Sequence, residues 1–130
     1  MIEVTIADLV NSNESLTKLS QIKGPGINAR VSYKISRTVK AIAKEIDEFF
    51  TFRKDLITEN QVETLTESGE KVLTIPEEKV AELDQQLKDL LEADVKIQVD
   101  KIKLSFIENG IGLDPLDFLK LDYLIEDDTA

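Results

Sequence analysis

A run of apolar residues at helical spacing dominates the middle of the chain. The run consists of Ile35, Val39, Ile42, Ile46, Phe49 and Leu56, at steps of 4, 3, 4, 3 and 7 residues. Such steps place the side chains along one stripe of an α-helix and are typical of a coiled-coil seam. The skipped heptad position is Arg53. The pattern predicts a helix from about residue 28 to about residue 60, roughly 45 Å long at the usual rise per residue.

A second, shorter stripe of the same kind lies within residues 76–93. It consists of Val80, Leu83, Leu87 and Leu90. Pro76 fits the first turn of a helix, and Glu77 and Glu78 favour the positive end of the helix dipole. Because the two seams match, we expect the two helices to pack antiparallel as a coiled-coil-like helical hairpin.

The segment between these helices, residues 61–76, contains two short alternating runs around Ser68-Gly69. This pattern predicts a β-hairpin insert. Because the first helix is longer than the second, we expect Leu65 and Leu73 of the insert to cover its overhanging turns. A disordered, solvated loop is the alternative, since such short runs carry little information.

The remaining strands are expected near the two ends of the chain. Ile2, Val4 and Ile6 alternate with polar residues and predict a half-buried strand. Residues 95–107 predict a second strand, with a bulge near Asp100-Lys101, where the apolar phase shifts by one residue. We expect these two strands to pair with each other.

Helices are expected beside both strands. The first begins at Ala7 or Asp8 and ends at the Gly-Pro-Gly of residues 24–26. Its apolar side consists of Leu9, Val10, Leu16 and Leu19. In the C-terminal helix, we expect Asp114 to cap the first turn and Pro115 to occupy its first position. The apolar side of that helix is expected to consist of Leu116, Leu119, Tyr123 and Leu124.

This order of elements predicts an α+β fold. We expect a single domain over residues 1–130, because this length fits one hydrophobic core. Residues 1–27 and 94–130 would form a body, in which a small antiparallel sheet packs with helices. Residues 28–93 would form a long helical hairpin arm that carries the insert of residues 61–76.

The composition excludes several kinds of chemistry. The chain has no Cys, His or Trp. Disulfides, thiol nucleophiles, Cys/His zinc sites and histidine acid–base catalysis are therefore excluded. No spacing of carboxylates matches a calcium-binding loop. We expect a protein that uses no cofactor or metal and is not an enzyme.

The N-terminal segment is not expected to be a secretory signal. No basic stretch precedes its apolar residues, and Glu3 interrupts them. No apolar run approaches the roughly 20 residues that span a bilayer. We expect a protein without membrane association, located in the cytoplasm or in a soluble assembly.

Charge is distributed unevenly along the chain. The net charge is −10, yet residues 15–44 contain seven basic residues and no acid. Five of the seven fall within about 120° on one side of the predicted long helix. They are Arg30, Lys34, Arg37, Lys40 and Lys44. This basic stripe is either a surface for nucleic acid or an acidic partner, or a solvated helix face. Nucleic acid is not the expected partner, because domains that bind it usually carry net positive charge.

A cluster of phenylalanines lies at the break in the long seam. Phe49 belongs to the seam, whereas Phe50 and Phe52 lie beside it. Exposed apolar patches favour association with other proteins. We therefore select Phe49, Phe50, Phe52 and Arg53 as a candidate interaction surface. Core packing against the hairpin insert is the alternative.

Three strings carry a family resemblance. They are "INARVSYKISRTVKAI" in the long helix, "LKDLLEADVKIQVDKIKL" across the shorter helix and the following strand, and "LDPLDFLKLDYLIED" near the end. Together they resemble a family of small proteins of unknown function encoded by tailed phages and prophages of Gram-positive bacteria. The resemblance covers nearly the whole chain and is weakest in residues 60–76. It implies a phage product in the bacterial host cytoplasm or in the virion, and it supplies no catalytic residues.

Two functions are expected in this setting, both based on protein–protein interaction. The first is a virion-associated or assembly protein that binds a phage structural protein or forms a homo-oligomer. The second is an inhibitor or regulator of a host factor, such as a defence nuclease, whose acidic surface mimics nucleic acid.

Overall fold

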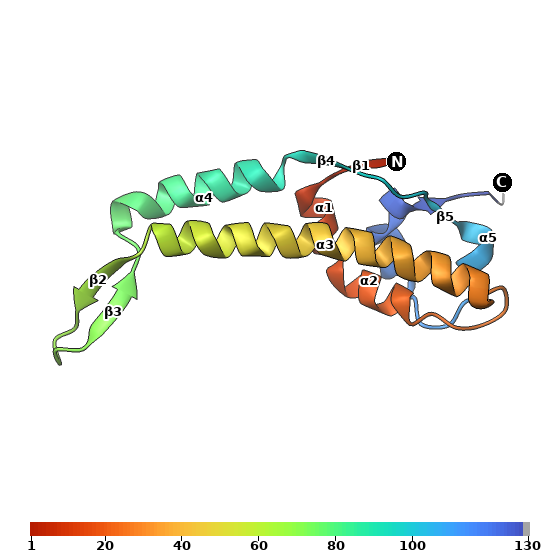
Figure 1. The fold of residues 1–130 in the computed structure, drawn as a ribbon, viewed down its shortest axis with the longest axis horizontal. Coiled ribbons are helices and arrows are strands. Elements are labelled where there is room, and N and C mark those ends of the chain that lie inside the picture. The colour runs from red at the N-terminus through yellow and green to blue at the C-terminus, as the bar shows by residue number, and fades with distance from the viewer. Residues whose placement is uncertain (129–130) are drawn as a thin grey trace.

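The structure, a computed structural model, describes residues 1–128 and shows an elongated molecule (Figure 1). A body lies at one end, and two helices extend from it to a small hairpin at the other end. The elements in chain order are β1 (Ile2–Thr5), α1 (Ile6–Asn11), α2 (Asn13–Ser20), α3 (Ala29–Glu59), β2 (Val62–Leu65), β3 (Lys71–Thr74), α4 (Glu77–Leu91), β4 (Asp94–Ile97), β5 (Ile102–Lys103), α5 (Leu104–Ile107), α6 (Pro115–Lys120), the 3₁₀ helix η1 (Asp122–Leu124) and β6 (Ile125–Glu126). The predicted mixture of helices and small antiparallel strand pairs is confirmed, as is the long helix.

Helix α3 is the longest element, with 31 residues, and its predicted limits are confirmed. Asn28 caps its first turn, because its side-chain oxygen accepts a hydrogen bond of 2.9 Å from the backbone N–H of Val31. In the preceding loop Gly24 and Gly26 have φ angles of 131° and 87°, which only glycine adopts without strain. This loop reverses the chain between α2 and α3 (Figure 1).

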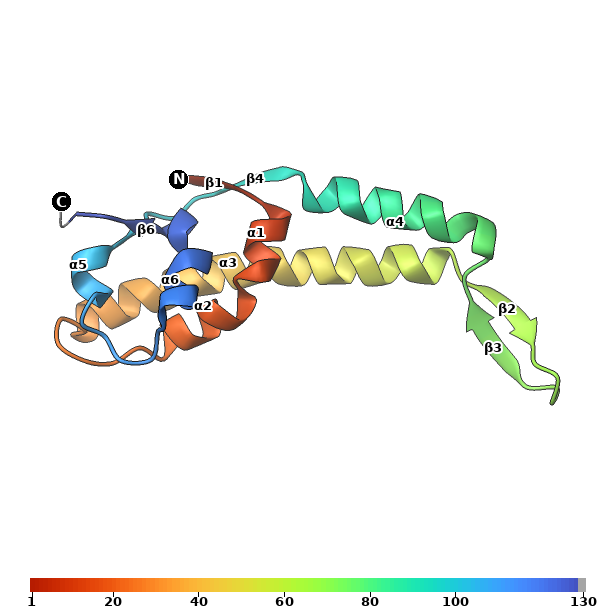
Figure 2. The ribbon, with the colours of Figure 1, turned by 180° about the vertical axis from the view of Figure 1, so that it is seen from behind.

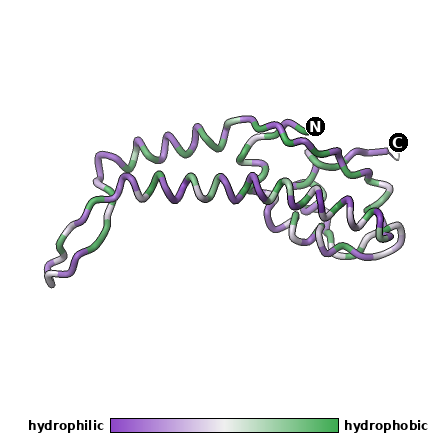
Figure 3. Tube along the Cα trace, in the orientation of Figure 1, coloured by the Kyte–Doolittle hydropathy of each residue, from purple (hydrophilic) through white to green (hydrophobic). Residues whose placement is uncertain are grey.

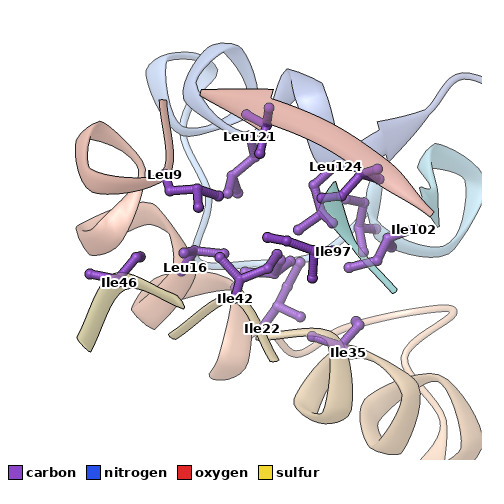
Figure 4. Packing of buried hydrophobic residues seen from close by; sticks show 14 of the residues in the cluster. Leu9, Leu16, Ile22, Ile35, Ile42, Ile46, Ile97, Ile102, Leu121 and Leu124 are labelled. Atoms are coloured by element: carbon purple, nitrogen blue, oxygen red, sulfur yellow. The ribbon is translucent and has the colours of Figure 1, made fainter. Parts of the chain in front are cut away.

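The hydrophobic core lies in the body, where α1 and α2 pack against α3. Figure 4 shows side chains from both ends of the chain converging there. The buried residues labelled in it are Leu9, Leu16, Ile22, Ile35, Ile42, Ile46, Ile97, Ile102, Leu121 and Leu124. The first half of α3 is therefore part of the body, and the portion of this helix that projects begins further along than residue 28.

The N-terminal strand pairs as predicted. β1 and β4 are antiparallel, with Ile2 opposite Ile97 and Val4 opposite Val95. Ile2, Val4 and Ile97 are buried, so this pair turns one face to the core. The side-chain alternation in both segments accounts for this arrangement.

The prediction of a single strand over residues 95–107 is wrong. β4 ends at Ile97, and β5 is a separate two-residue strand that pairs in parallel with β6. The residues that follow β5 form the short helix α5. Its start is stabilised from the far end of the chain, because the carboxylate of Asp128 accepts hydrogen bonds from the backbone N–H and the hydroxyl of Ser105, at 2.9 and 2.6 Å.

The C-terminal helix begins as predicted, but its buried side differs from the prediction. Asp114 and Asp117 form a reciprocal capping box, with Pro115 in the first turn. The helix turns Asp117 and, one turn later, Leu121 toward the core. Of the predicted apolar residues, Leu124 is buried, but Leu116 and Leu119 are 55% and 71% exposed.

A buried polar cluster joins α6 to α2. The Ser15 hydroxyl donates a hydrogen bond of 2.6 Å to the Asp117 carboxylate, and the Lys18 ammonium lies 3.2 Å from the same group. The hydrogen bonds from Ser15 and from the backbone N–H of Asp114, together with Lys18, lower the pKa of the Asp117 carboxyl from 3.8 to about 2, although its burial opposes this shift. The pattern of apolar residues gave no indication of this cluster.

Helix α4 runs back beside the second half of α3, in the opposite direction (Figures 1 and 2). Leu83 is buried, Leu87 and Leu90 are half-buried, and Val80 is exposed. The coiled-coil interpretation of this helix pair stays a prediction. Helix α4 begins beside the last turns of α3 (Figure 1), and α1 and α2 pack against α3 in the body.

Candidate interaction surface at the end of the arm

Strands β2 and β3 form a two-stranded antiparallel hairpin at the far end of the molecule. Val62 lies opposite Thr74 and Leu65 opposite Lys71. The connecting turn is closed by a hydrogen bond of 2.8 Å from the backbone N–H of Thr66 to the carbonyl of Glu70. Gly69 in this turn has a φ angle of 85°, which explains the glycine at this position.

The hairpin points away from both helices of the arm (Figures 1 and 2). The expectation that Leu65 and Leu73 cover turns of α3 is therefore wrong. Leu65 is 70% exposed and Leu73 is 64% exposed. The two side chains share one face of the hairpin with an ion pair in which the Lys71 Nζ and Glu63 Oε1 atoms lie 3.7 Å apart.

The opposite face of the hairpin is also apolar in part. It carries Val62 and Val72, which are both exposed. Within residues 1–128 each strand pairs only with the other, so both outer edges present backbone N–H and C=O groups without a neighbouring strand. Edges of this kind are templates for pairing with a further strand. The tip, which we define as residues 62–74, thus combines exposed apolar side chains on both faces with two open edges. Figure 3 shows that hydrophobic and hydrophilic residues are mixed along it.

The arm that carries the tip is strongly acidic. We define the arm as residues 45–94, which comprise the second half of α3, the tip and α4. It contains 15 acidic and 5 basic residues, so its net charge of −10 equals that of the whole chain. The rest of the chain is neutral overall, because it contains 11 acidic and 11 basic residues, five of the latter in the first half of α3. The structure therefore separates a neutral body from an acidic arm with an apolar end.

The phenylalanines selected from the sequence do not form one patch. Phe49 is buried, beside residues of α1, α4 and β4 such as Leu9, Leu90 and Val95, and not against the hairpin. Its ring centroid lies 5.5 Å from that of Phe50. Phe50 and Phe52 are exposed on opposite flanks of α3, because positions two residues apart do not face each other on a helix.

Arg53 and the basic stripe lie along α3 but away from the tip. Arg53 is exposed, although it occupies a seam position. Arg30, Arg37, Lys40 and Lys44 are exposed on α3, whereas Lys34 is half-buried at the flank of the helix, near Met1 and Lys103 of the body. The guanidinium of Arg37 lies 5.9 Å from the ring centroid of Tyr33, within the range of a cation–π contact. None of these selected residues belongs to the tip.

The tip was missed as a binding surface although the sequence contains a signal for it. A hairpin that packs on a core carries its apolar residues on one face. Here the four apolar residues of the two strands divide evenly between the faces. With the turn placed at Ser68-Gly69, the alternation of side chains along the two strands already assigns two apolar residues to each face. A hairpin of this kind cannot bury all its apolar side chains against its own chain.

Comparisons of the chain with protein-family models, with curated proteins and with solved structures find no match. The resemblance to a phage family rests on the quoted strings, and the phage setting stays a prediction.

Within residues 1–128, no helix has both the length and the apolar character to cross a membrane. No group of three or more acidic side chains in this part of the chain is arranged to hold a metal ion.

Proposed function

We propose that this chain is a non-enzymatic protein that acts by protein–protein interaction, with the tip of the arm as its binding element. The observation that carries the proposal is an ordered hairpin whose eight strand residues are all exposed. An isolated two-stranded hairpin is only marginally stable in water, and it gains stability by packing against a further strand or a helix. The chain itself supplies neither at the tip.

A protein partner would supply the missing contacts. Fully burying a leucine side chain contributes about 1.5–3 kcal/mol, so the leucine face of the tip offers a compact anchor. The open edges permit the addition of a partner strand. The acidic arm behind the tip favours a partner whose surface is basic around an apolar pocket. In the proposed phage setting, such a partner is a structural protein of the virion or its assembly machinery.

The acidic arm also favours the second candidate function. An inhibitor that mimics nucleic acid needs a rod-like surface with many carboxylates, and all of the net charge of this chain lies on such a surface. Its target would be the basic nucleic-acid-binding site of a host protein. In that case the carboxylates of α4 would contribute more to binding than the leucines of the tip.

A double substitution at the tip tests the proposed function. Leu65→Ser with Leu73→Ser removes the apolar anchor and leaves the hairpin hydrogen bonds in place. We expect roughly 100-fold weaker binding, because two leucine contacts of at least about 1.5 kcal/mol each are lost. The partner is first captured on the tagged wild-type chain from a lysate of the organism that encodes it. The affinity of the purified partner for each variant is then measured by calorimetry.

The matched control is Leu116→Ser with Leu119→Ser in the body, since these leucines are exposed to a similar degree at the other end of the molecule. We expect this variant to bind as the wild-type chain does. Equal binding by the tip variant would refute the tip as the binding element. Loss of binding only when Glu82 and Asp84 of α4 are replaced by lysine would favour the inhibitor instead.

A further inference from the structure

The outer side of α3 is a long surface that no other element of the described part of the chain covers. In Figure 1 this helix lies in front along its length, whereas in Figure 2, seen from behind, α1, α2 and α6 lie in front of it. The shallow surface on the outer side is lined by residues of α3 alone. Tyr33 and Phe52 are both exposed on it. This face is therefore available to another molecule.

The charges on this face change sign halfway along the helix. The basic half contains Arg37, Lys40 and Lys44, and the acidic half contains Asp47, Glu48 and Asp55. All six side chains are exposed. Arg53 and Lys54, the two basic residues of the second half of α3, lie outside the set that lines the face. Within the described residues, none of the six charged side chains forms an ion pair with another side chain of the chain.

Such a face is complementary to itself in one orientation. If two copies pack with their α3 helices antiparallel, the basic half of each lies along the acidic half of the other. A two-fold axis relates the copies, so each attractive contact occurs twice. Parallel packing would place like charges opposite one another, which is unfavourable. A nucleic acid along the whole face would meet the acidic half and be repelled.

We propose that the outer face of α3 is a homodimer interface in which two copies pack antiparallel. An axis near residue 46 places Lys44 opposite Glu48 and Arg37 opposite Asp55 of the second copy. The same register places Lys40 opposite Phe52, a pair suited to a cation–π contact. Ala41 and Ala43 also line the face, and their short side chains permit close approach of the helices.

The proposed dimer also fits the overall shape of the molecule. Antiparallel α3 helices direct the two arms to opposite sides, so each body would lie beside the arm of the other copy. Both tips would remain exposed, far from the axis. The dimer would then present two copies of the proposed binding element and could link two partners. The interface itself does not depend on the function proposed for the tip.

Charge inversion of each half tests the interface. One variant carries Arg37→Glu, Lys40→Glu and Lys44→Glu; the other carries Asp47→Lys, Glu48→Lys and Asp55→Lys. Sedimentation velocity should show a dimer for the wild-type chain and a monomer for each variant alone. An equimolar mixture of the variants should return to the mass of a dimer, because an acidic face then meets a basic one. A monomeric wild-type chain, or a mixture that stays monomeric, would overturn the proposal.

Two controls separate the face from a general effect of charge. Each inverted residue changes the net charge by two units, so the variants carry −16 and −4. Glu82→Lys, Asp84→Lys and Glu92→Lys on α4 also gives −4 and should remain a dimer. The tip variant should remain a dimer as well, so failure of the tip proposal and failure of the interface are distinguishable.

The absence of cysteine from the chain allows the orientation to be measured directly. Ser36→Cys and Asp55→Cys are made in separate chains. Antiparallel packing predicts a disulfide between the two different variants when they are mixed and oxidised, and little between two copies of either one. Efficient linkage of Ser36→Cys to itself would show parallel packing and contradict the proposed geometry.

Discussion

Replacing Ile42 by alanine is expected to lower the free energy of unfolding by about 3–4 kcal/mol. Ile42 is fully buried at the centre of the body core, between α3 and the segments from both ends of the chain (Figure 4). Truncation of such a side chain removes its transfer free energy and leaves a cavity among neighbours that relax only in part. Urea denaturation followed by circular dichroism measures the change.

The control for this prediction is Leu73→Ala at the tip. Leu73 is 64% exposed, so its truncation should change the free energy of unfolding by less than about 0.5 kcal/mol. If Ile42→Ala and Leu73→Ala lowered the free energy of unfolding by similar amounts, the tip would contribute to folding as much as the core does. That result would contradict the division between body and tip.

Replacing Asp117 by asparagine is expected to cost about 2 kcal/mol of stability at neutral pH. Asparagine can still accept the hydrogen bond from Ser15, but it loses the charge that pairs with Lys18 and the strong acceptor for the backbone N–H of Asp114. The lowered pKa of the Asp117 carboxyl agrees in sign, because the folded chain favours the carboxylate over the protonated form.

The lowered pKa of Asp117 gives this prediction a pH dependence with a definite sign. Because the folded chain holds the carboxylate more strongly than the unfolded chain, the stabilisation is fully present above the unfolded pKa of 3.8. It decreases as the pH falls toward 2. The stability difference between the wild-type chain and Asp117→Asn should therefore be constant from neutral pH to about pH 5 and shrink below pH 4.

Asp122→Asn is the control for the pH series, because Asp122 is exposed. Its substitution should change the free energy of unfolding by less than about 0.5 kcal/mol. If the stability difference between the wild-type chain and Asp117→Asn stayed the same below pH 4, the ionised carboxylate of Asp117 would not be the stabilising form.

The parts of the fold that the sequence predicted well are those with local causes. The limits of α3 follow from Asn28 as a cap and from the glycines before it, and its buried side follows from the spacing of its apolar residues. The start of α6 follows in the same way from Asp114 and Pro115. In each case the residues that determine the element lie within a few positions of it.

The parts that were missed have causes far away in the sequence. Helix α5 stands where a strand was predicted, and its first turn is hydrogen-bonded to Asp128, which lies 23 residues after Ser105. The buried side of α6 is determined by Ser15, which lies 102 residues before Asp117. The hydrogen bond between Ser15 and Asp117 directs the Asp117 side of α6 toward the core. Leu116 and Leu119 are therefore exposed, although their spacing predicts that they are buried.

The candidate site was predicted only in part, for a different reason. The sequence indicated a β-hairpin between the two arm helices. The expected packing of this hairpin against α3 assumed that α3 extends beyond α4 at the end of the arm where the hairpin lies. In the structure the extra length of α3 lies in the body, beside α2. Relative helix length alone does not determine which end overhangs, so the direction of the hairpin could not be predicted.

Hydrogen exchange measured by mass spectrometry shows whether residues 62–74 are the binding element. The free chain should show rapid exchange in residues 62–74 and slow exchange in the body core, because the tip has no packing of its own to protect it. Binding of the captured partner should slow exchange in the tip and leave the core unchanged. Protection that appears on the body or on α4 while the tip continues to exchange rapidly would contradict the account.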